Sequence, residues 1–502
     1  MIMRKWKVAL GALAGLIVGS CIGLVGNLPV KEWAPPFVAL GFLLFLALAR
    51  EPERWCLFIF LVIIPLPMHA FLLKLSPLHG GGALGIYLMA ADLPMLLLCF
   101  YWFLDWARKR NHGERRSNRF IVALLPFLVV SGLSIVYSVR PLWAVCEWLR
   151  WIKVLLILIY AAKRLRLRDV SWCLSAFAVS VLAESGLAIL QSGFQSNLGL
   201  DRLGLFGSAA TGALTQELAT GQVLYRGAAL TGHPNFLASY LLILLPVFGL
   251  LALVEQQKKV RLLWYLTLLI GLGGLVATMS RAAWISLLIA GAIGFMGAVF
   301  LSVIHPKKAV VITMGLLFVI GITALSFSSL IEKRFESDFS ASWDLRVKLN
   351  HTALAIAGDH PLGGVGLNNY TIVYPDYDPA FAAQLETMDN MITVVHNVYL
   401  LILAETGAFG LAAFLAFYFG VFVMTFRLLK RMDRWNKALA LGILCGLLGA
   451  LLFDLSEISL WMEITMYTIA FLVGTLEVIA PGSLRRVEPA FRRAWSRTRM
   501  PA

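Results

Sequence analysis

The chain has 502 residues, of which 60% are hydrophobic and 14% are charged, and its mean hydropathy is +0.81. Soluble domains carry roughly 45–50% apolar and about 25% charged residues, so this composition excludes a soluble protein and indicates a polytopic membrane protein. The formal net charge of +15 would suggest a nucleic-acid partner in a soluble protein. Here the cations cluster in short loops between apolar runs, where they orient the chain in the membrane.

Apolar runs of about 20 residues predict transmembrane helices. We expect an all-α, polytopic transmembrane helical bundle of about 12–14 spans, with a long, partly helical periplasmic loop. The span over 36–49 is short, and the span over 55–73 contains Pro65 and Pro67, which kink or break a helix. The predicted spans are 8–26, 36–49, 55–73, 84–104, 120–138, 146–161, 170–192, 234–254, 261–279, 283–303, 309–329, 396–426, 437–453 and 458–479.

Every strongly basic loop falls on one side of this arrangement, which predicts an even number of spans and both termini in the cytoplasm. The first apolar run, after Arg4, Lys5 and Lys7, lacks a convincing cleavage site, so we expect a retained helix rather than a signal peptide. The basic segments are 108–110, 115–116, 163–168, 258–261, 307–308, 427–437, 485–486 and 492–493.

Two long loops then lie outside the membrane, and loops of this length in a compact protein are usually functional. The second is acidic, with nine Asp or Glu against four Lys or Arg. It predicts a helix over 343–357, with Ser342 as the N-cap and Gly358 as the stop. The predicted regions are 1–192 (N-terminal helices), 193–232 (first periplasmic loop), 233–329 (central helices), 330–395 (second periplasmic loop), 396–480 (C-terminal helices) and 481–502 (basic cytoplasmic tail).

Three arginines lie on the outer face, against the usual orientation bias: Arg226, Arg281 and Arg346. The guanidinium fork suits bidentate binding of phosphate oxygens, so together they would make a diphosphate clamp. Alternatively, each arginine pairs with a carboxylate or caps a helix. Arg281 lies in a turn of only a few residues between two spans, and there we favour function.

His396 stands with Asn397 at the boundary between the acidic loop and an apolar run. Imidazole titrates near neutral pH and accepts a proton from a sugar hydroxyl, so His396 is the best candidate for a general base. Tyr399 shares its helical face, whereas Glu405 lies about half a turn away and holds a neighbouring helix or an arginine. The alternative is a histidine that is merely hydrogen-bonded at the interface.

His233 precedes Pro234, which fits the first turn of a helix. It either binds substrate or is a polar residue at a helix end. Glu184 forms a polar stripe with Ser180 and Gln191, which either lines a cavity or joins helices. Asp92 permits the same two interpretations. The six cysteines form no CxxC pair, and no P-loop, GxSxG or HExxH motif is evident, so we expect no cofactor and no metal.

In these motifs the chain resembles the O-antigen ligase/polymerase superfamily of bacterial membrane glycosyltransferases. The resemblance runs from about 226 to 410, and the earlier half matches only in hydropathy. The matching pieces, in the family's order, are Gly232-His233-Pro234-Asn235 with Ala238 and Tyr240; Thr278 with Ser280-Arg281-Ala282; Arg346 with His360-Pro361-Leu362-Gly363-Gly364-Val365-Gly366 and Tyr370; and His396-Asn397 with Tyr399-Leu400, Glu405, Gly407 and Gly410.

The resemblance implies a glycan donor carried on undecaprenyl diphosphate, an acceptor that is a glycan or lipid A-core, and a metal-independent, inverting transfer at the periplasmic face of the bacterial inner membrane. In that chemistry His396 deprotonates the acceptor, while Arg226 and Arg281 hold the diphosphate. The Gly-rich turn at 363–366 lets the backbone approach a sugar or the membrane surface. The substrate-binding set is Arg226, His233, Arg346, Tyr399, Asn397 and Glu184. Other polysaccharide assembly proteins are expected partners.

Ligases of this superfamily have about twelve spans, so a count of about fourteen favours a polymerase. The main alternative is a transporter or flippase of a lipid-linked glycan, although the chain shows no internal repeat. A metal-dependent glycosyltransferase would need paired acidic residues in an early outer loop, where only Glu32 stands.

Overall fold

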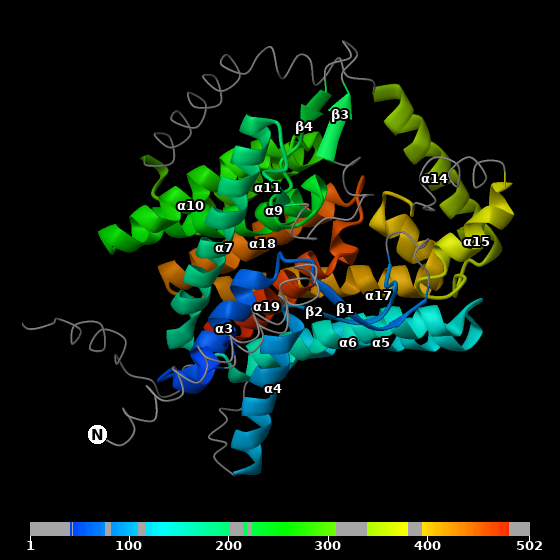
Figure 1. The fold of residues 1–502 in the computed structure, drawn as a ribbon. Coiled ribbons are helices and arrows are strands. Elements are labelled where there is room, and N and C mark those ends of the chain that lie inside the picture. Colours follow the sequence, from blue (N-terminus) through cyan, green and yellow to red (C-terminus); the bar gives the residue numbers. More distant parts are fainter. Residues whose placement is uncertain are drawn as a thin grey trace, which may run out of the picture.

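The computed structural model describes residues 41–42, 44–75, 82–108, 117–200, 214–217, 223–307, 339–379 and 394–480. They form a bundle of helices with two short β-hairpins (Figure 1). Within these ranges, seven helices are long and apolar enough to cross a membrane: α5 (Arg119–Tyr137), α7 (Leu167–Phe194), α9 (Pro234–Val254), α10 (Lys258–Ala277), α11 (Arg281–Phe300), α17 (Val398–Leu429) and α18 (Arg434–Phe453). This confirms the predicted all-α polytopic bundle.

The remaining elements are shorter or carry more charge. They are α3 (Pro52–Ile63), β1 (His69–Lys74), β2 (Gly85–Met89), α4 (Asp92–Ala107), α6 (Pro141–Arg164), β3 (Thr215–Glu217), β4 (Val223–Tyr225), α14 (Phe339–Asp359), α15 (Tyr370–Tyr377), the 3₁₀ turn η2 (Ser459–Trp461) and α19 (Glu463–Ile479). The predicted spans 8–26 and 309–329 and the basic tail 481–502 lie outside the described residues.

Two predicted spans are wrong. Helix α3 ends at Ile63, just before Pro65 and Pro67, because proline removes a backbone donor and clashes with the preceding turn. The chain then forms β1, which pairs antiparallel with β2. Helix α4 begins only after this hairpin. Within the described residues, the segments 55–73 and 84–104 are therefore each divided between a helix and a strand.

Helix α9 lies at the centre of the bundle and is buried on nearly every side, as expected for a helix that is apolar all round. Helix α18 packs against it through glycines. A Cβ on Gly446 would lie 2.2 Å from the carbonyl oxygen of Ile243, and one on Gly442 would lie 2.6 Å from Cα of Val247. Small residues spaced in this way let two helix backbones approach closely within a membrane.

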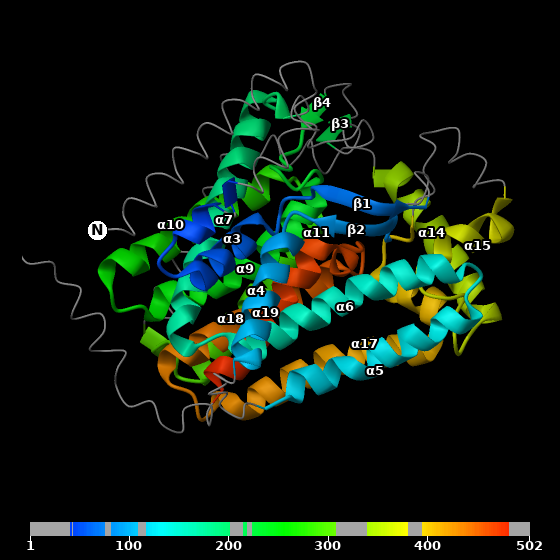
Figure 2. The same cartoon turned by 60° about the horizontal axis from the view of Figure 1, so that its bottom comes forward.

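Helices α5, α6 and α17 run side by side, and α14 packs on α17 (Figure 2). The loop helix is longer than predicted: α14 starts at Phe339 and ends at Asp359, so Ser342 and Gly358 lie within it instead of marking its ends. Its predicted apolar stripe is confirmed, since Leu349, Ala353 and Ile356 are buried. This buried stripe packs α14 against α17.

Helix α17 is broken at Gly407, whose backbone angles (φ 65°, ψ −169°) are accessible essentially only to glycine. Residues 361–366, which include the Gly-rich turn at 363–366, fill the break. Gly366 N–H donates to the carbonyl of Glu405 at 2.8 Å, and Val365 N–H donates to that of Ala404 at 3.0 Å. The turn therefore satisfies carbonyl groups that the interrupted helix leaves unpaired.

A buried ion-pair network joins α6 to the C-terminal segment. Arg150 contacts Glu147 at 2.5 Å and Glu463 at 2.8 Å, and it donates to the carbonyl of Trp461 at 2.6 Å. Buried charges are tolerated only when they are paired and hydrogen-bonded. The network ties η2 and the start of α19 to α6. It therefore fixes the C-terminal end of the segment between α18 and α19.

Asp92 is part of the same buried region. Its carboxylate accepts from Lys153 Nζ at 2.7 Å, from Tyr467 Oη at 2.7 Å and from the N–H of Met89 at 2.9 Å. Of the two interpretations offered by the sequence, these contacts favour a residue that joins helices.

Candidate active site

The start of α17 and the link after α18 lie against each other. Val398 N–H points at the carbonyl oxygens of Asp454 and Glu457, each at 3.2 Å. Asn397 caps α17: its Oδ1 accepts from the N–H groups of Tyr399 and Leu400, and its Nδ2 donates to the carbonyl of Leu455 at 3.0 Å. This double role of Asn397 fixes the residue before it, His396, beside Glu457.

Glu457 is the centre of the site. Its carboxylate accepts from Arg346 at 2.7 Å and from Asn235 Nδ2 at 2.8 Å, and it lies 3.5 Å from Nδ1 of His396. The carboxylate side chain is 6% exposed, whereas those of Arg346 and His396 are 33% and 27% exposed. Burial alone would raise the pKa of Glu457, but His396 and Arg346 outweigh it and hold that pKa at about 2. Glu457 is therefore a buried anion covered by partly exposed cationic and imidazole groups.

Arg226 reaches the same cluster from the segment after β4. Its Nη2 donates to Oδ1 of Asn235 at 2.9 Å, and its Nε donates to the carbonyl of Thr278 at 3.0 Å. Burial lowers the pKa of Arg226 to about 10, and repulsion from Arg346 and Arg281 contributes to the shift. The guanidinium remains charged at neutral pH. The three outer arginines predicted from the sequence are thus brought into one region.

Arg281 is the first residue of α11, and only residues 278–280 separate that helix from α10, which confirms the predicted short turn. Met279 takes a left-handed conformation (φ 52°) in this turn. The carbonyl of Thr278 accepts from Arg226, so the turn also links the two arginines.

His233 caps α9. Its Nδ1 accepts from the N–H of Asn235 at 3.1 Å, and Pro234 occupies the first turn as predicted. Burial lowers the pKa of His233 to about 4, so the ring is neutral at pH 7. A neutral ring whose Nδ1 accepts a hydrogen bond fits the prediction that His233 is a polar residue at a helix end. Through this hydrogen bond His233 also helps to position Asn235, which contacts Glu457. Direct contact of His233 with substrate stays a prediction.

Glu184 and Gln191 hold the loop that carries Arg226. The Glu184 carboxylate accepts from the N–H of Leu230 at 2.9 Å, and the side-chain oxygen of Gln191 accepts from the N–H groups of Ala228 and Ala229. The polar stripe on α7 therefore joins a helix to a loop at Glu184 and Gln191, where the sequence analysis offered a cavity lining or a joint between helices. Binding of substrate by Glu184 stays a prediction.

Two further residues at the start of α17 have structural contacts. Tyr399 Oη donates to the carbonyl of Leu451 at 2.6 Å, which ties α17 to α18. The Glu405 carboxylate accepts from the N–H groups of Asn368 and Tyr370 at 2.7 and 3.2 Å. Glu405 therefore holds the loop after the Gly-rich turn, where the sequence predicted a neighbouring helix or an arginine.

The Gly-rich turn itself meets α17. A Cβ on Gly364 would lie 2.3 Å from the carbonyl carbon of Glu405, and one on Gly366 would lie 2.1 Å from Cβ of Ser138. The close approach that these glycines permit is therefore to protein, where the sequence analysis expected a sugar or the membrane surface.

Glu457 was missed by the sequence analysis, which left 454–457 as a link between two apolar runs. The available signal was a pair of carboxylates, Asp454 and Glu457, in a four-residue link on the same side as the three outer arginines. Asp454 shapes this link, since it accepts from the N–H groups of Ser459 and Leu460 at 3.0 and 2.6 Å.

The arrangement combines a half-buried imidazole beside a carboxylate with guanidinium groups from three separate segments. A histidine oriented by a carboxylate can accept a proton from a hydroxyl, and several guanidinium groups can bind phosphate oxygens and stabilise developing negative charge. Within the described ranges, no group of three or more His, Cys, Asp or Glu side chains is placed to hold a metal ion.

Residues 266–415 match a family model described as O-antigen ligase. The match contains Arg281, Arg346, His396, the Gly-rich turn and Glu405, whereas Arg226 and Glu457 lie outside it. It confirms the resemblance to the O-antigen ligase/polymerase superfamily. No curated protein matches the chain.

Proposed function

We propose that this membrane protein, as an enzyme of the O-antigen ligase/polymerase type, transfers a glycan from undecaprenyl diphosphate to an acceptor hydroxyl at the periplasmic face. The observation that carries the proposal is a cluster around one buried carboxylate, Glu457, which Arg346 and His396 contact. Asn235 links Arg226 to the same carboxylate, and Arg281 lies close enough to interact with the charges of Arg226 and Arg346. The named groups carry more positive than negative charge, which suits an anionic substrate. They come from segments far apart in the chain, yet the fold brings them to one end of the bundle.

In the proposed reaction the acceptor oxygen attacks the anomeric carbon of the donor sugar as its proton passes to His396. The bond between that carbon and the diphosphate oxygen breaks, and the lipid diphosphate leaves with the bonding electrons. Arg226 and Arg281 hold the diphosphate and stabilise its growing charge. A single displacement of this kind inverts the anomeric centre and needs no metal ion.

Glu457 is assigned a positioning role. It faces Nδ1 of His396, which leaves Nε2 as the nitrogen that meets the acceptor hydroxyl. It also fixes Arg346, so one carboxylate sets the geometry of the proposed base and of a proposed donor contact. Asn235 completes the chain of contacts from Glu457 to Arg226.

The proposal has two forms, which differ in the identity of the acceptor. A second lipid-linked glycan as acceptor makes the protein a polymerase, which the sequence-based span count favoured. Lipid A-core as acceptor makes it a ligase.

The test uses the full chain in nanodiscs with an undecaprenyl-diphosphate-linked oligosaccharide, and measures release of undecaprenyl diphosphate with and without lipid A-core. Longer lipid-linked glycans without added core identify a polymerase, and product that needs core identifies a ligase. A folded preparation that consumes neither substrate contradicts the proposal and favours the transporter alternative.

A further inference from the structure

A pocket of about 290 Å³ lies between the beginnings of α3 and α7 and the ends of α4 and α6. It is far from the candidate active site. Helix α7 has 28 residues, which corresponds to about 42 Å. Its first turn lines the pocket, while Gln191 near its other end holds the loop before α9. In the proposed orientation the pocket opens on the cytoplasmic side, and no step of the glycan transfer uses it.

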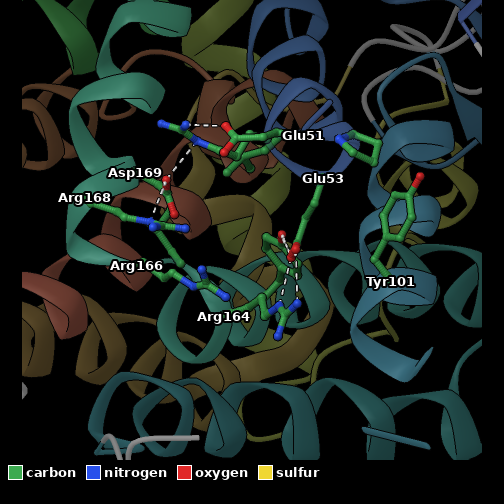
Figure 3. A pocket seen from close by; sticks show the side chains of 12 residues that line it. Glu51, Glu53, Tyr101, Arg164, Arg166, Arg168 and Asp169 are labelled. Atoms are coloured by element: carbon green, nitrogen blue, oxygen red, sulfur yellow. Dashed lines mark hydrogen bonds and ion pairs between the residues drawn. The ribbon is translucent and has the colours of Figure 1, made fainter. Parts of the chain in front are cut away.

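Four arginines line this pocket, and two of them are held by carboxylates (Figure 3). Arg54 contacts Glu51 at 2.5 Å and Asp169 at 3.0 Å. Arg164 contacts Glu53 at 2.8 Å and also pairs with Asp105. These pairs form a rigid frame at the meeting point of the four helices.

The other two arginines, Arg166 and Arg168, are exposed at the start of α7. Arg168 lies 3.8 Å from Asp169, beyond hydrogen-bond distance. Arg166 makes no side-chain hydrogen bond or ion pair with the described residues. In Figure 3, Arg164, Arg166 and Arg168 lie along one side of the pocket, and Tyr101 lies across from them. The four arginines face four carboxylates, Glu51, Glu53, Asp105 and Asp169, so the charges balance overall. Arg166 and Arg168 supply guanidinium donors that no hydrogen bond with the described residues uses.

The surroundings of the pocket are aromatic, and part of these aromatic side chains is exposed. Trp55 and Trp172 pack edge to face at 5.1 Å beside it, and the guanidinium of Arg54 lies 5.4 Å from the centre of the Trp172 ring. On α4, Phe103 and Trp106 are 56% and 62% exposed. Tryptophan gathers at the level of lipid headgroups, so the pocket mouth lies at that level.

We propose that this pocket binds a phosphate-bearing anion through Arg166 and Arg168, and that its source is the headgroup of an anionic membrane lipid. Pockets between membrane helices on the cytoplasmic side that present arginine donors have the position to hold such headgroups. The volume is near the lower end of the roughly 300–1,000 Å³ range of small-molecule sites, which suits a headgroup. The acyl chains then lie along the exposed aromatic side chains of α4.

The experiment uses the purified full chain in neutral detergent and native mass spectrometry to follow binding of short-chain phosphatidylglycerol. The double variant Arg166→Ala with Arg168→Ala is compared with Lys258→Ala with Lys259→Ala. The control removes the same charge from exposed positions at the start of α10, on the same side of the bundle. Thermal unfolding of each variant confirms that it is folded.

We expect the pocket variant to bind phosphatidylglycerol at least tenfold more weakly, and the control less than twofold more weakly. Short-chain phosphatidylcholine should bind the wild type more weakly than phosphatidylglycerol. Equal losses in both variants, or no loss in the pocket variant, overturn the proposal. If inorganic phosphate binds as tightly, with the same dependence on the arginines, the pocket is an anion site whose source is a free phosphate and the lipid assignment is wrong.

Discussion

Replacing Glu457 by glutamine removes one negative charge from the candidate site and keeps the size of the side chain. The carboxylate oxygen that accepts from Arg346 and Asn235 at 2.7 and 2.8 Å is replaced by an amide oxygen, which still accepts both. The other oxygen lies 3.5 Å from Nδ1 of His396, and an NH₂ group takes its place. A donor then faces Nδ1, so the tautomer that leaves Nε2 free as a base is disfavoured.

The expected loss follows from this geometry. Converting the carboxylate of a serine-protease triad to an amide lowers kcat by about 10⁴, because the histidine adopts the wrong tautomer. Here the contact exceeds hydrogen-bond length and the His396 side chain is 27% exposed, so water replaces part of the lost support. We therefore expect kcat for Glu457→Gln to fall by about 10²–10³, which corresponds to about 3–4 kcal/mol of transition-state stabilisation.

The assay is release of undecaprenyl diphosphate by the full chain in nanodiscs, with Glu457→Asp as the variant that keeps the charge. The pKa of Glu457 is lowered from 4.5 to about 2, so its stabilising effect is complete above about pH 4.5 and is lost as the pH falls toward 2. Glu457 is therefore ionised at both pH 6 and pH 8, so its own titration adds no pH dependence to the defect of Glu457→Gln in this range. A folded Glu457→Gln protein that keeps more than half of the wild-type rate would refute the reasoning.

Further variants test the other parts of the site and fold. His396→Ala should lower transfer by about 10²–10⁴ without changing the unfolding temperature; undiminished transfer removes His396 as the base. Arg281→Lys keeps the charge but loses the fork, so donor binding should weaken about tenfold, and normal binding contradicts the clamp. Gly407→Ala should destabilise the protein by about 2–4 kcal/mol in thermal unfolding, since its backbone angles suit only glycine and its Cβ would lie 2.2 Å from the carbonyl carbon of Leu362. Gly420→Ala in the same helix, with its nearest contact at 3.7 Å, should be near neutral. A chelator should leave transfer unchanged, and strong inhibition contradicts the metal-free mechanism.

Hydropathy predicted most of the helices because a membrane span needs a long apolar run, and α5, α7, α9 and α11 each begin and end within a few residues of the predicted bounds. The β1–β2 hairpin was missed because its strands are as apolar as the helices beside them. Phe71, Leu72 and Leu73 extend the hydropathy of α3 without extending its helix. The local signs of the change were Pro65 and Pro67 and the run Gly80-Gly81-Gly82 between the two strands.

The gathering of the outer arginines was predicted from the side of the membrane on which each one lies. The contact of Arg346 with Glu457, and the link from Glu457 through Asn235 to Arg226, were not predicted, because that carboxylate reaches Arg346 across 111 positions of the chain and Asn235 across 222. No periodicity within one helix carries such information. The structural roles of Asn397 and Glu184 were hidden for the same reason, since their partners are backbone groups of other segments.

The buried pairing of Arg150 has a consequence for how the protein is made. Arg150 enters the membrane with α6, but the carbonyl of Trp461 that it contacts is synthesised 311 residues later, and Glu463 follows Trp461 by two positions. Until α19 has been inserted, Arg150 relies on Glu147 alone, and an incompletely paired charge in the bilayer is costly. A nascent chain that stops before α19 therefore leaves Arg150 incompletely paired, so the predicted span that carries this residue becomes stable in the bilayer only when the end of the chain has been made.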